Sequence, residues 1–435
     1  MVLASTLTAA PAFAQDFVDE PGPGVAIGGV SVKGHARLYD YRHWHNNNQP
    51  YPTQDPADRH DDRGTAVGGD LIMESGTLRG FSGGLSIYTQ QALVHYDREN
   101  SSLAPHVTHF GEAFLRHQTS VSRLTAGRQL MQTPFANGDM FTMLPRAFQG
   151  ISGALDFGGA NVTKQRNDGA DPFALNVLAP FADDAKPGAP DIKVYAARMN
   201  RYESRFGSHF TDENRYSSGL HAVDPAVPLA TPGLFTAGLQ YSQGFEAGDV
   251  LARLWGYNFF DYANMQFLEA GYQAKKLAGG ARPYLRLQYI HESDSGASRA
   301  GNVHATYYGA KLGLEYGKAG VAVVFENAPS HAGAFRNGGL LHPYSDLSGV
   351  LYDDTLNNGL EDLGPGRALG LQVDYSPNKK FTVTTKYVRY LAYYGTNGAF
   401  YAYDGPAYFA GQGLIGGRLV RDNRVTNGIS RRRCI

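Results

Sequence analysis

The sequence predicts an all-β protein: a closed antiparallel transmembrane β-barrel of about 18 strands, with a constriction loop folded into its interior. The prediction rests on an apparent export signal, on the lack of an apolar run long enough for a membrane-spanning helix, and on short segments in which apolar and polar residues alternate. The chain has 435 residues, including 53 Gly, 27 Tyr and 23 Phe. This composition is typical of strands joined by turns.

Residues 1–14 form an apolar, small-residue segment that ends on Ala12-Phe13-Ala14, which matches a signal-peptide cleavage pattern. We therefore expect a signal peptide over residues 1–14 and a single barrel domain over residues 15–435. The segment lacks the usual basic start, so we expect the signal peptide to be truncated there. The only cysteine, Cys434, cannot form an internal disulfide, and stability has to come from the sheet.

The charges nearly cancel, with 39 Lys and Arg against 40 Asp and Glu, which gives no general attraction to nucleic acid. We expect no metal and no cofactor, because no zinc-type spacing of His43, His45 and His60 and no complete EF-hand loop is present. Loose Ca²⁺ binding by a long acidic loop stays open, through the carboxylates of Asp55, Asp58, Asp61 and Asp62. The string GFSGG at residues 80–84 fits a nucleophile motif, but a strand-like stretch follows it where a helix is needed, so we expect no enzyme.

Alternation begins at residues 32–39, where Ala36 and Leu38 share one face and Arg37 and Tyr39 the other. The same pattern returns at residues 235–242, 249–257, 285–289, 310–315 and 369–374. A soluble β-sandwich would also alternate, but an exported chain with so many such segments is better closed into a barrel, with its apolar face toward lipid. Because an Arg or Lys facing lipid at midplane costs about 2–4 kcal/mol, strand charges should face the lumen.

Two stretches resemble the OprD family of substrate-selective outer-membrane porins. FVDE at residues 17–20 with GHARLYDYRHW at 34–44 resembles the mature start of that family. RLTAGRQLMQTPFANGDMFTMLPRAFQG at 123–150 resembles the strand and inward loop that narrow the family's barrel. The resemblance implies an 18-stranded outer-membrane barrel, a monomer or loose trimer, inserted by the barrel-assembly machinery among lipid and lipopolysaccharide. It also implies passage of small carboxylate-bearing solutes, such as amino acids and organic acids, along a row of basic side chains.

The predicted site combines this basic row with the loop. The pore-lining basic residues are expected to be Arg37, Arg128, Arg253, Arg286, Lys311, Lys386 and Arg389. Lys386 and Arg389 have opposite parity, so one of them should lie at a bulge or beyond the membrane. The constriction-loop residues are expected to be Pro134, Phe135, Asp139, Phe141, Pro145, Arg146 and Phe148. Asp139 and Arg146 would set up a transverse electric field across the constriction. The three phenylalanines would form an apolar wall, and the two prolines would stiffen the loop by fixing φ.

The function expected from these features is passive diffusion of small polar solutes. A non-conducting structural barrel or adhesin remains the alternative, as does a set of basic residues that are simply neutralised by neighbouring acids. An outer-membrane hydrolase would need a Ser, His and acid cluster that the sequence does not offer. The C-terminal NGISRRRCI lacks the aromatic end typical of family barrels. A frameshift after about Val425 would explain it, and barrel closure would then suffer.

Overall fold

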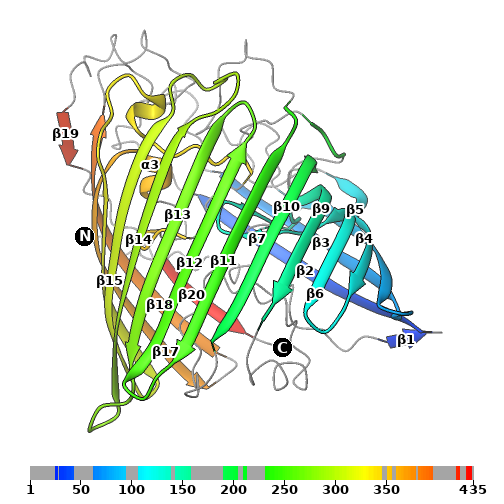
Figure 1. Ribbon diagram of the computed structural model, residues 1–435, viewed down its shortest axis with the longest axis horizontal. Helices are drawn as coiled ribbons and strands as arrows, with labels where there is room; N and C mark the ends of the chain where they lie inside the picture. Colours follow the sequence, from blue (N-terminus) through cyan, green and yellow to red (C-terminus); the bar gives the residue numbers. More distant parts are fainter. Residues whose placement is uncertain are drawn as a thin grey trace.

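The computed structural model describes residues 25–27, 29–43, 62–94, 106–138, 143–157, 190–203, 209–212, 231–344, 350–354, 359–378, 381–394, 418–421 and 428–433. One antiparallel sheet of 18 strands dominates this part of the chain, as predicted (Figure 1). Among the described residues no helix has the length and apolar character needed to cross a membrane.

The sheet strands have the following bounds: β1 (Val25–Ile27), β2 (Val30–His43), β3 (Asp62–Ser75), β4 (Phe81–Val94), β5 (Val107–Gln118), β6 (Ser122–Gln129), β9 (Ala147–Asp156), β10 (Asp191–Glu203), β11 (Leu234–Gly244), β12 (Gly248–Phe259), β13 (Ala263–Ala274), β14 (Ala281–Asp294), β15 (His304–Tyr316), β16 (Ala319–Ala328), β17 (Gly366–Asn378), β18 (Phe381–Tyr394), β19 (Arg418–Arg421) and β20 (Gly428–Arg433). The short elements are β7 (Gln132–Thr133), β8 (Ala136–Asn137), the 3-10 turn η2 (Phe335–Asn337) and α3 (Leu360–Leu363).

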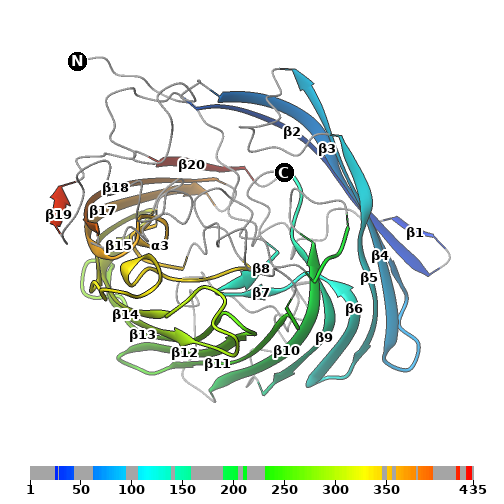
Figure 2. The same cartoon turned by 90° about the horizontal axis from the view of Figure 1, so that it is seen from above.

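From β2 to β18 each strand pairs with the next one along the chain, and β6 pairs with β9 across the β7–β8 hairpin. At the edges, β1 pairs with β2, while β20 and β19 pair with different parts of β18. Figure 2 shows this sheet curling round an interior that holds β7, β8 and α3. No pairing joins β2 to β19 or β20 in the described part of the chain.

The two faces of the sheet differ as the sequence alternation predicts. On β12 the side chains of Arg253, Trp255 and Tyr257 are buried on the concave face, while Leu254 between them is 51% exposed on the convex face. The segments expected to alternate all lie in strands, namely β2, β11, β12, β14, β15 and β17. The buried half of each strand therefore faces the interior, and the exposed half is mostly aliphatic or aromatic.

The first inward segment, residues 131–138 and 143–148, crosses the interior. At one end Phe135 is fully buried, with its ring 5.8 Å from that of Phe267 and 6.1 Å from that of Tyr257. At the other end Met143 and Leu144 join a buried cluster with Ala66 and Tyr88 on β3 and β4. The segment thus contacts two walls of the sheet that lie far apart in sequence.

The second inward segment, residues 337–344, 350–354 and 359–361, comes from the connection between β16 and β17. Its side chains join the main buried cluster, including Leu340, Leu341, Leu351 and Leu360. A parallel bridge between Ala136 and Tyr344 connects the two inward segments. Together they occupy the interior beside β12–β18, and the buried polar side chains of that wall include Arg253, Glu269, Arg286 and Glu326.

Candidate functional site

Basic side chains line the concave face of β12–β18 next to the second inward segment. Arg253 projects from β12, Arg286 from β14 and Lys311 from β15. Arg286 and Lys311 are direct cross-strand partners, so two like charges stand opposite each other. Such a pair is unfavourable unless anions lie close by, which makes the nearby carboxylates decisive for the site.

Glu269 on β13 is the carboxylate that holds the two arginines. Its Oε2 accepts a bond of 3.0 Å from Nη1 of Arg253, and its Oε1 lies 2.8 Å from Nη2 of Arg286. The hydroxyl of Tyr352, in the second inward segment, donates to the same Oε1 over 2.8 Å. All three ionic side chains are at least nine-tenths buried. Charge-assisted bonds in such a dry setting fix the guanidinium groups in place.

Lys311 is held differently, through neutral groups. Its ammonium donates to Oε1 of Gln372 on β17 over 3.0 Å. Gln372 in turn donates to Asp374 over 2.8 Å, and Asp374 also accepts a bond of 2.6 Å from Thr384. The direct partner of Lys311 is therefore an amide and not a carboxylate, and its side chain is partly buried.

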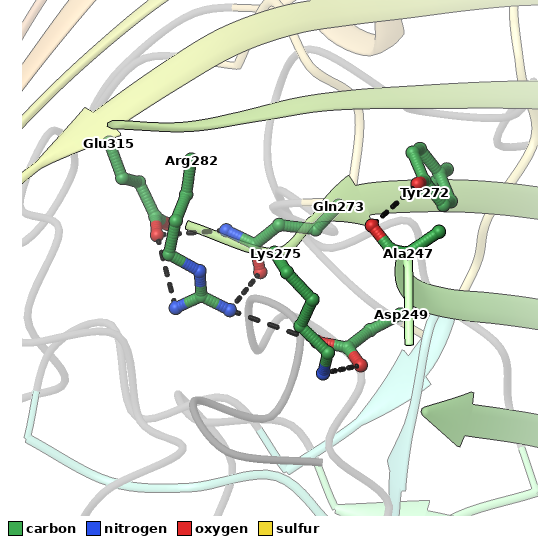
Figure 3. Close-up of polar contacts among 7 residues, drawn as sticks. All are labelled: Ala247, Asp249, Tyr272, Gln273, Lys275, Arg282 and Glu315. Carbon is green, nitrogen blue, oxygen red and sulfur yellow. Dashed lines mark hydrogen bonds and ion pairs between the residues drawn. The ribbon is translucent and has the colours of Figure 1, made fainter. Parts of the chain in front are cut away.

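A second polar network lies at the end of the strands where the turns are short (Figure 3). Lys275 donates to Asp249 over 2.6 Å, and Arg282 lies 3.8 Å from Asp249 and 3.7 Å from Glu315. Gln273 joins Arg282 to Glu315, because its side chain accepts a hydrogen bond from Arg282 over 3.1 Å and donates one to Glu315 over 2.8 Å. Two cations and two carboxylates thus neutralise each other at this rim.

Arg37 lies on the concave face of the far wall, where β2–β5 carry their own polar groups. Nδ1 of His35 lies 2.7 Å from Asp70, and Asp70 also attracts the guanidinium of Arg37. The hydroxyl of Tyr88 on β4 donates to Glu112 over 3.1 Å. Arg37 is therefore separated from the row on β12–β15 by the interior and by the first inward segment.

Two of the predicted pore-lining residues lie on the convex face, which corrects that part of the prediction. Arg128 has the parity of Leu124, which is 53% exposed, and its guanidinium lies over the ring of Phe210 at 4.4 Å. Arg389 is exposed and pairs across the sheet with exposed Leu369. The register of β17 and β18 is regular from Lys386 to Arg389, so no bulge turns the arginine inward.

The predicted constriction-loop residues fall into two groups. Pro134, Phe135, Pro145, Arg146 and Phe148 are all buried in the first inward segment. Asp139 and Phe141 lie outside the described residues, so the transverse field expected between Asp139 and Arg146 stays a prediction. Phe135 and Phe148 pack into the aromatic cluster with Tyr257 and Tyr344.

Sequence reasoning missed Glu269 and the whole second inward segment. Glu269 faces inward next to exposed Leu268, so its parity alone marks it as a partner for Arg253. The second segment had a compositional signal, since GGLLHPY at 338–344 and VLY at 350–352 are too apolar for a solvated connection.

No group of three or more metal-ligating side chains occurs among the residues that the structure describes. The acidic stretch containing Asp55, Asp58 and Asp61 lies outside them, as does the side chain of Asp62. Ser82 of the GFSGG string is part of β4, so the strand-to-helix turn of a nucleophile elbow does not form there.

No protein-family model and no curated protein sequence matches the chain. Its fold does match solved structures. OpdK of Pseudomonas aeruginosa, crystallised with vanillate, aligns with a TM-score of 0.57 and 15% identity over 83% of this chain and 82% of that chain. OpdF of the same organism, in complex with glucuronate, gives a TM-score of 0.56 and 16% identity over 83% of this chain and 80% of that chain.

A BenF-like porin from Pseudomonas fluorescens Pf-5 aligns with a TM-score of 0.59 and 14% identity, over 83% of this chain and 82% of that chain. Identities this low show shared architecture and carry no residue roles. The sheet order, the inward segments and these alignments lead to one conclusion: the chain has the fold of the OprD-family outer-membrane porins.

Proposed function

We propose that the chain is an outer-membrane porin, a closed barrel with no enzymatic activity that lets small carboxylate-bearing solutes diffuse through its interior. The observation that carries this proposal is the basic row on the concave face, above all the Arg286–Lys311 pair beside the buried Glu269. The shared fold and the aliphatic convex face support a position in the outer membrane.

The chemistry of the row suits a carboxylate. Arg286 and Lys311 face each other, and one carboxylate, Glu269, is shared between Arg286 and Arg253. Lys311 has an amide and no carboxylate as its direct partner among the described residues, so a solute anion would be attracted to its ammonium. Because the site is a side-chain row and not a tight cage, binding stays weak enough for passage. Vanillate and glucuronate, present in two related crystal structures, both carry a carboxylate.

Several further features belong to the proposal. We expect removal of residues 1–14, closure of the sheet, a monomer or loose trimer, and insertion by the barrel-assembly machinery among lipid and lipopolysaccharide. The first inward segment would act as the constriction, because it crosses the interior from β12–β13 to β3–β4. A transverse field between Asp139 and Arg146 would orient a zwitterion there.

The non-conducting barrel or adhesin is the second candidate. The observation in its favour is the amount of chain inside: both inward segments are buried, and they contact each other at Ala136 and Tyr344. A passage then has to lie beside them, along Lys311 and the far wall. Conductance measurements separate the two candidates directly.

The test uses the purified chain in planar bilayers with a salt gradient. A porin gives stepwise conductance and a reversal potential that favours anions. Lys311→Gln is expected to shift the reversal potential toward zero, because it removes the ammonium whose hydrogen bond in the described part of the chain goes to the amide of Gln372. Lys276→Gln is the matched control, since Lys276 lies exposed in a turn. Absent conductance in a heat-modifiable, assembled barrel would favour the adhesin, and equal shifts in both variants would exclude Lys311 from the path.

A further inference from the structure

Two lysines lie on the concave face of β12–β18, Lys311 and Lys386, which has the parity of buried Val388 and Tyr390, and they differ in what their ammonium groups contact. Lys311 donates to Gln372, so its bond connects two strands of the wall. Lys386, on β18, donates to the main-chain carbonyl of Asp354 over 2.6 Å. That carbonyl belongs to the second inward segment. One lysine is therefore held within the wall, and the other connects the wall to the chain inside it.

Other side chains of the wall hold the same stretch, residues 350–354, by its main chain. Gln288 on β14 donates to the carbonyl of Val350 over 3.1 Å and accepts from the amide of Tyr352 over 3.3 Å. The hydroxyl of Tyr390 donates to the carbonyl of Asp353 over 2.8 Å. The amide side chain of Gln288 thus acts like a neighbouring strand, and four backbone groups of the stretch are hydrogen-bonded to side chains of the wall.

Lys386 differs from the other side chains that hold this stretch because it has carboxyl groups on several sides. Its ammonium is attracted by four carboxylates, those of Asp354, Asp353, Glu326 and Asp374. Glu326 is fully buried on β16, and neither of its carboxylate oxygens has a hydrogen-bond partner among the described residues. Without the ammonium, the carboxyl groups of Glu326, Asp353 and Asp354 would lose their cationic neighbour at the contact between the segment and the wall.

We propose that Lys386 is a positioning residue that clamps residues 350–354 of the second inward segment against β18. It sets the width of the passage and does not bind the solute. The statement about the passage rests on the proposed function, while the clamp is a property of the structure alone. The row therefore divides into Lys311, which attracts the anion, and Lys386, which holds the segment that bounds its path.

The test compares Lys386→Met with Lys311→Met in the full chain in lipid nanodiscs, by amide hydrogen exchange of the peptide that covers residues 350–354. Because Lys386→Met loses a charge-assisted hydrogen bond, the exchange rate of this peptide should rise on the order of tenfold in that variant. In Lys311→Met the exchange rate should stay near that of the wild type. Lys386→Arg, which keeps the charge, should restore most of the protection. Wild-type exchange in Lys386→Met, or equal acceleration in both variants, overturns the clamp.

Should Lys386→Met fail to assemble, Lys386→Gln gives the same comparison, because its amide keeps a donor but no charge. Faster exchange than in the wild type supports the clamp, and unchanged exchange overturns it. In bilayers, Lys386→Met should raise conductance with little change in reversal potential, the reverse of Lys311→Met. A wild type without conductance would defeat the proposed function, whereas faster exchange in Lys386→Met would still support the clamp.

Discussion

Glu269 shows how one buried carboxylate can organise a row of cations. It accepts from Arg253 and Arg286 and from the hydroxyl of Tyr352, which belongs to the second inward segment. Removing its charge leaves two buried guanidinium groups without their shared anion. Breaking a buried ion pair on one side costs about 3–5 kcal/mol, and the remaining amide oxygen of a glutamine recovers part of this cost.

We therefore expect Glu269→Gln to lower the stability of the folded chain by about 3 kcal/mol. The measurement is the temperature at which the folded band on semi-native gels converts to the unfolded one. Glu246→Gln, in an exposed turn, is the matched control and should leave that temperature unchanged. The same variant should strengthen anion preference, since a negative charge is lost beside Lys311. If Glu269→Gln converts at the same temperature as the wild type, Glu269 is not needed as a counter-charge.

Strand parity explains which single residues could be predicted. Arg253, Arg286 and Lys311 alternate with apolar neighbours on regular strands, so the face of each follows from its sequence position. Arg128 could not be placed in this way, because it was assigned from its closeness to the loop. Partners such as Gln372 for Lys311 depend on register across three strands, which no local pattern contains.

Among the elements, the connection from β16 to β17 starts next to a cluster of histidines. The ring of His331 lies 4.1 Å from that of His304, and His304 lies 5.8 Å from His291. Burial, and then the positive charges that His304 and His291 would carry, lower the pKa of His331 below its ordinary 6.5. The amide of His331 also donates to the carbonyl of Asn337, at the start of the second inward segment.

A histidine with a lowered pKa binds its proton more readily when the segment opens. The folded arrangement is therefore fully stable above about pH 6.5 and loses stability as the pH falls below that value. We expect exchange of the amides in residues 331–338, corrected for intrinsic rates, to speed up as the pH drops through this range. His331→Gln should remove most of that dependence, and His209→Gln, at an exposed site, should retain it. An unaltered pH profile in His331→Gln would point to another group.

At this scale the sequence allowed the strands and one inward segment to be predicted, but not the other. The strands follow from period-two alternation. The family resemblance predicts the first inward segment, and the apolar side chains of Phe135 and Phe148 predict that it is buried. The second inward segment has no periodic pattern, and its position depends on acceptors and donors from three strands, such as Gln288 and Tyr390. Tertiary contacts of this kind leave only an apolar composition in the sequence.

At the scale of the whole sheet, Arg389 on the convex face of β18 stands in an apolar row. Across six strands the residues in register with Arg389 are apolar: Ala252, Ala270, Leu287, Ala310, Phe325 and Leu369. If the convex face contacts lipid, as proposed, an arginine in this row is unfavourable by about 2–4 kcal/mol. Arg389 is then the one charged residue in this row of seven strands.

Arg389→Leu is expected to stabilise the folded chain in lipid by about 2–4 kcal/mol, which would show as a higher urea midpoint in liposomes. Arg367→Leu serves as the control, because Arg367 sits near the strand end and donates to Asn327 over 3.2 Å, so no gain is expected there. A midpoint for Arg389→Leu at or below that of the wild type would mean that the arginine does not face hydrocarbon.

The first inward segment also constrains the order in which the molecule can be completed. The backbone amide of Phe135 donates a hydrogen bond to the hydroxyl of Tyr257, 122 residues further along the chain, while Met143 and Leu144 pack against β3 and β4. A chain that adds strands in sequence order holds one end of this segment early, but the other has no partner until β12 and β13 arrive. Contacts between such distant residues form late, because a long loop has to close first. The sheet is thus assembled before the first inward segment is fully packed. An arrest after β11 would yield a partial sheet in which Phe135 lacks its partners on β12 and β13.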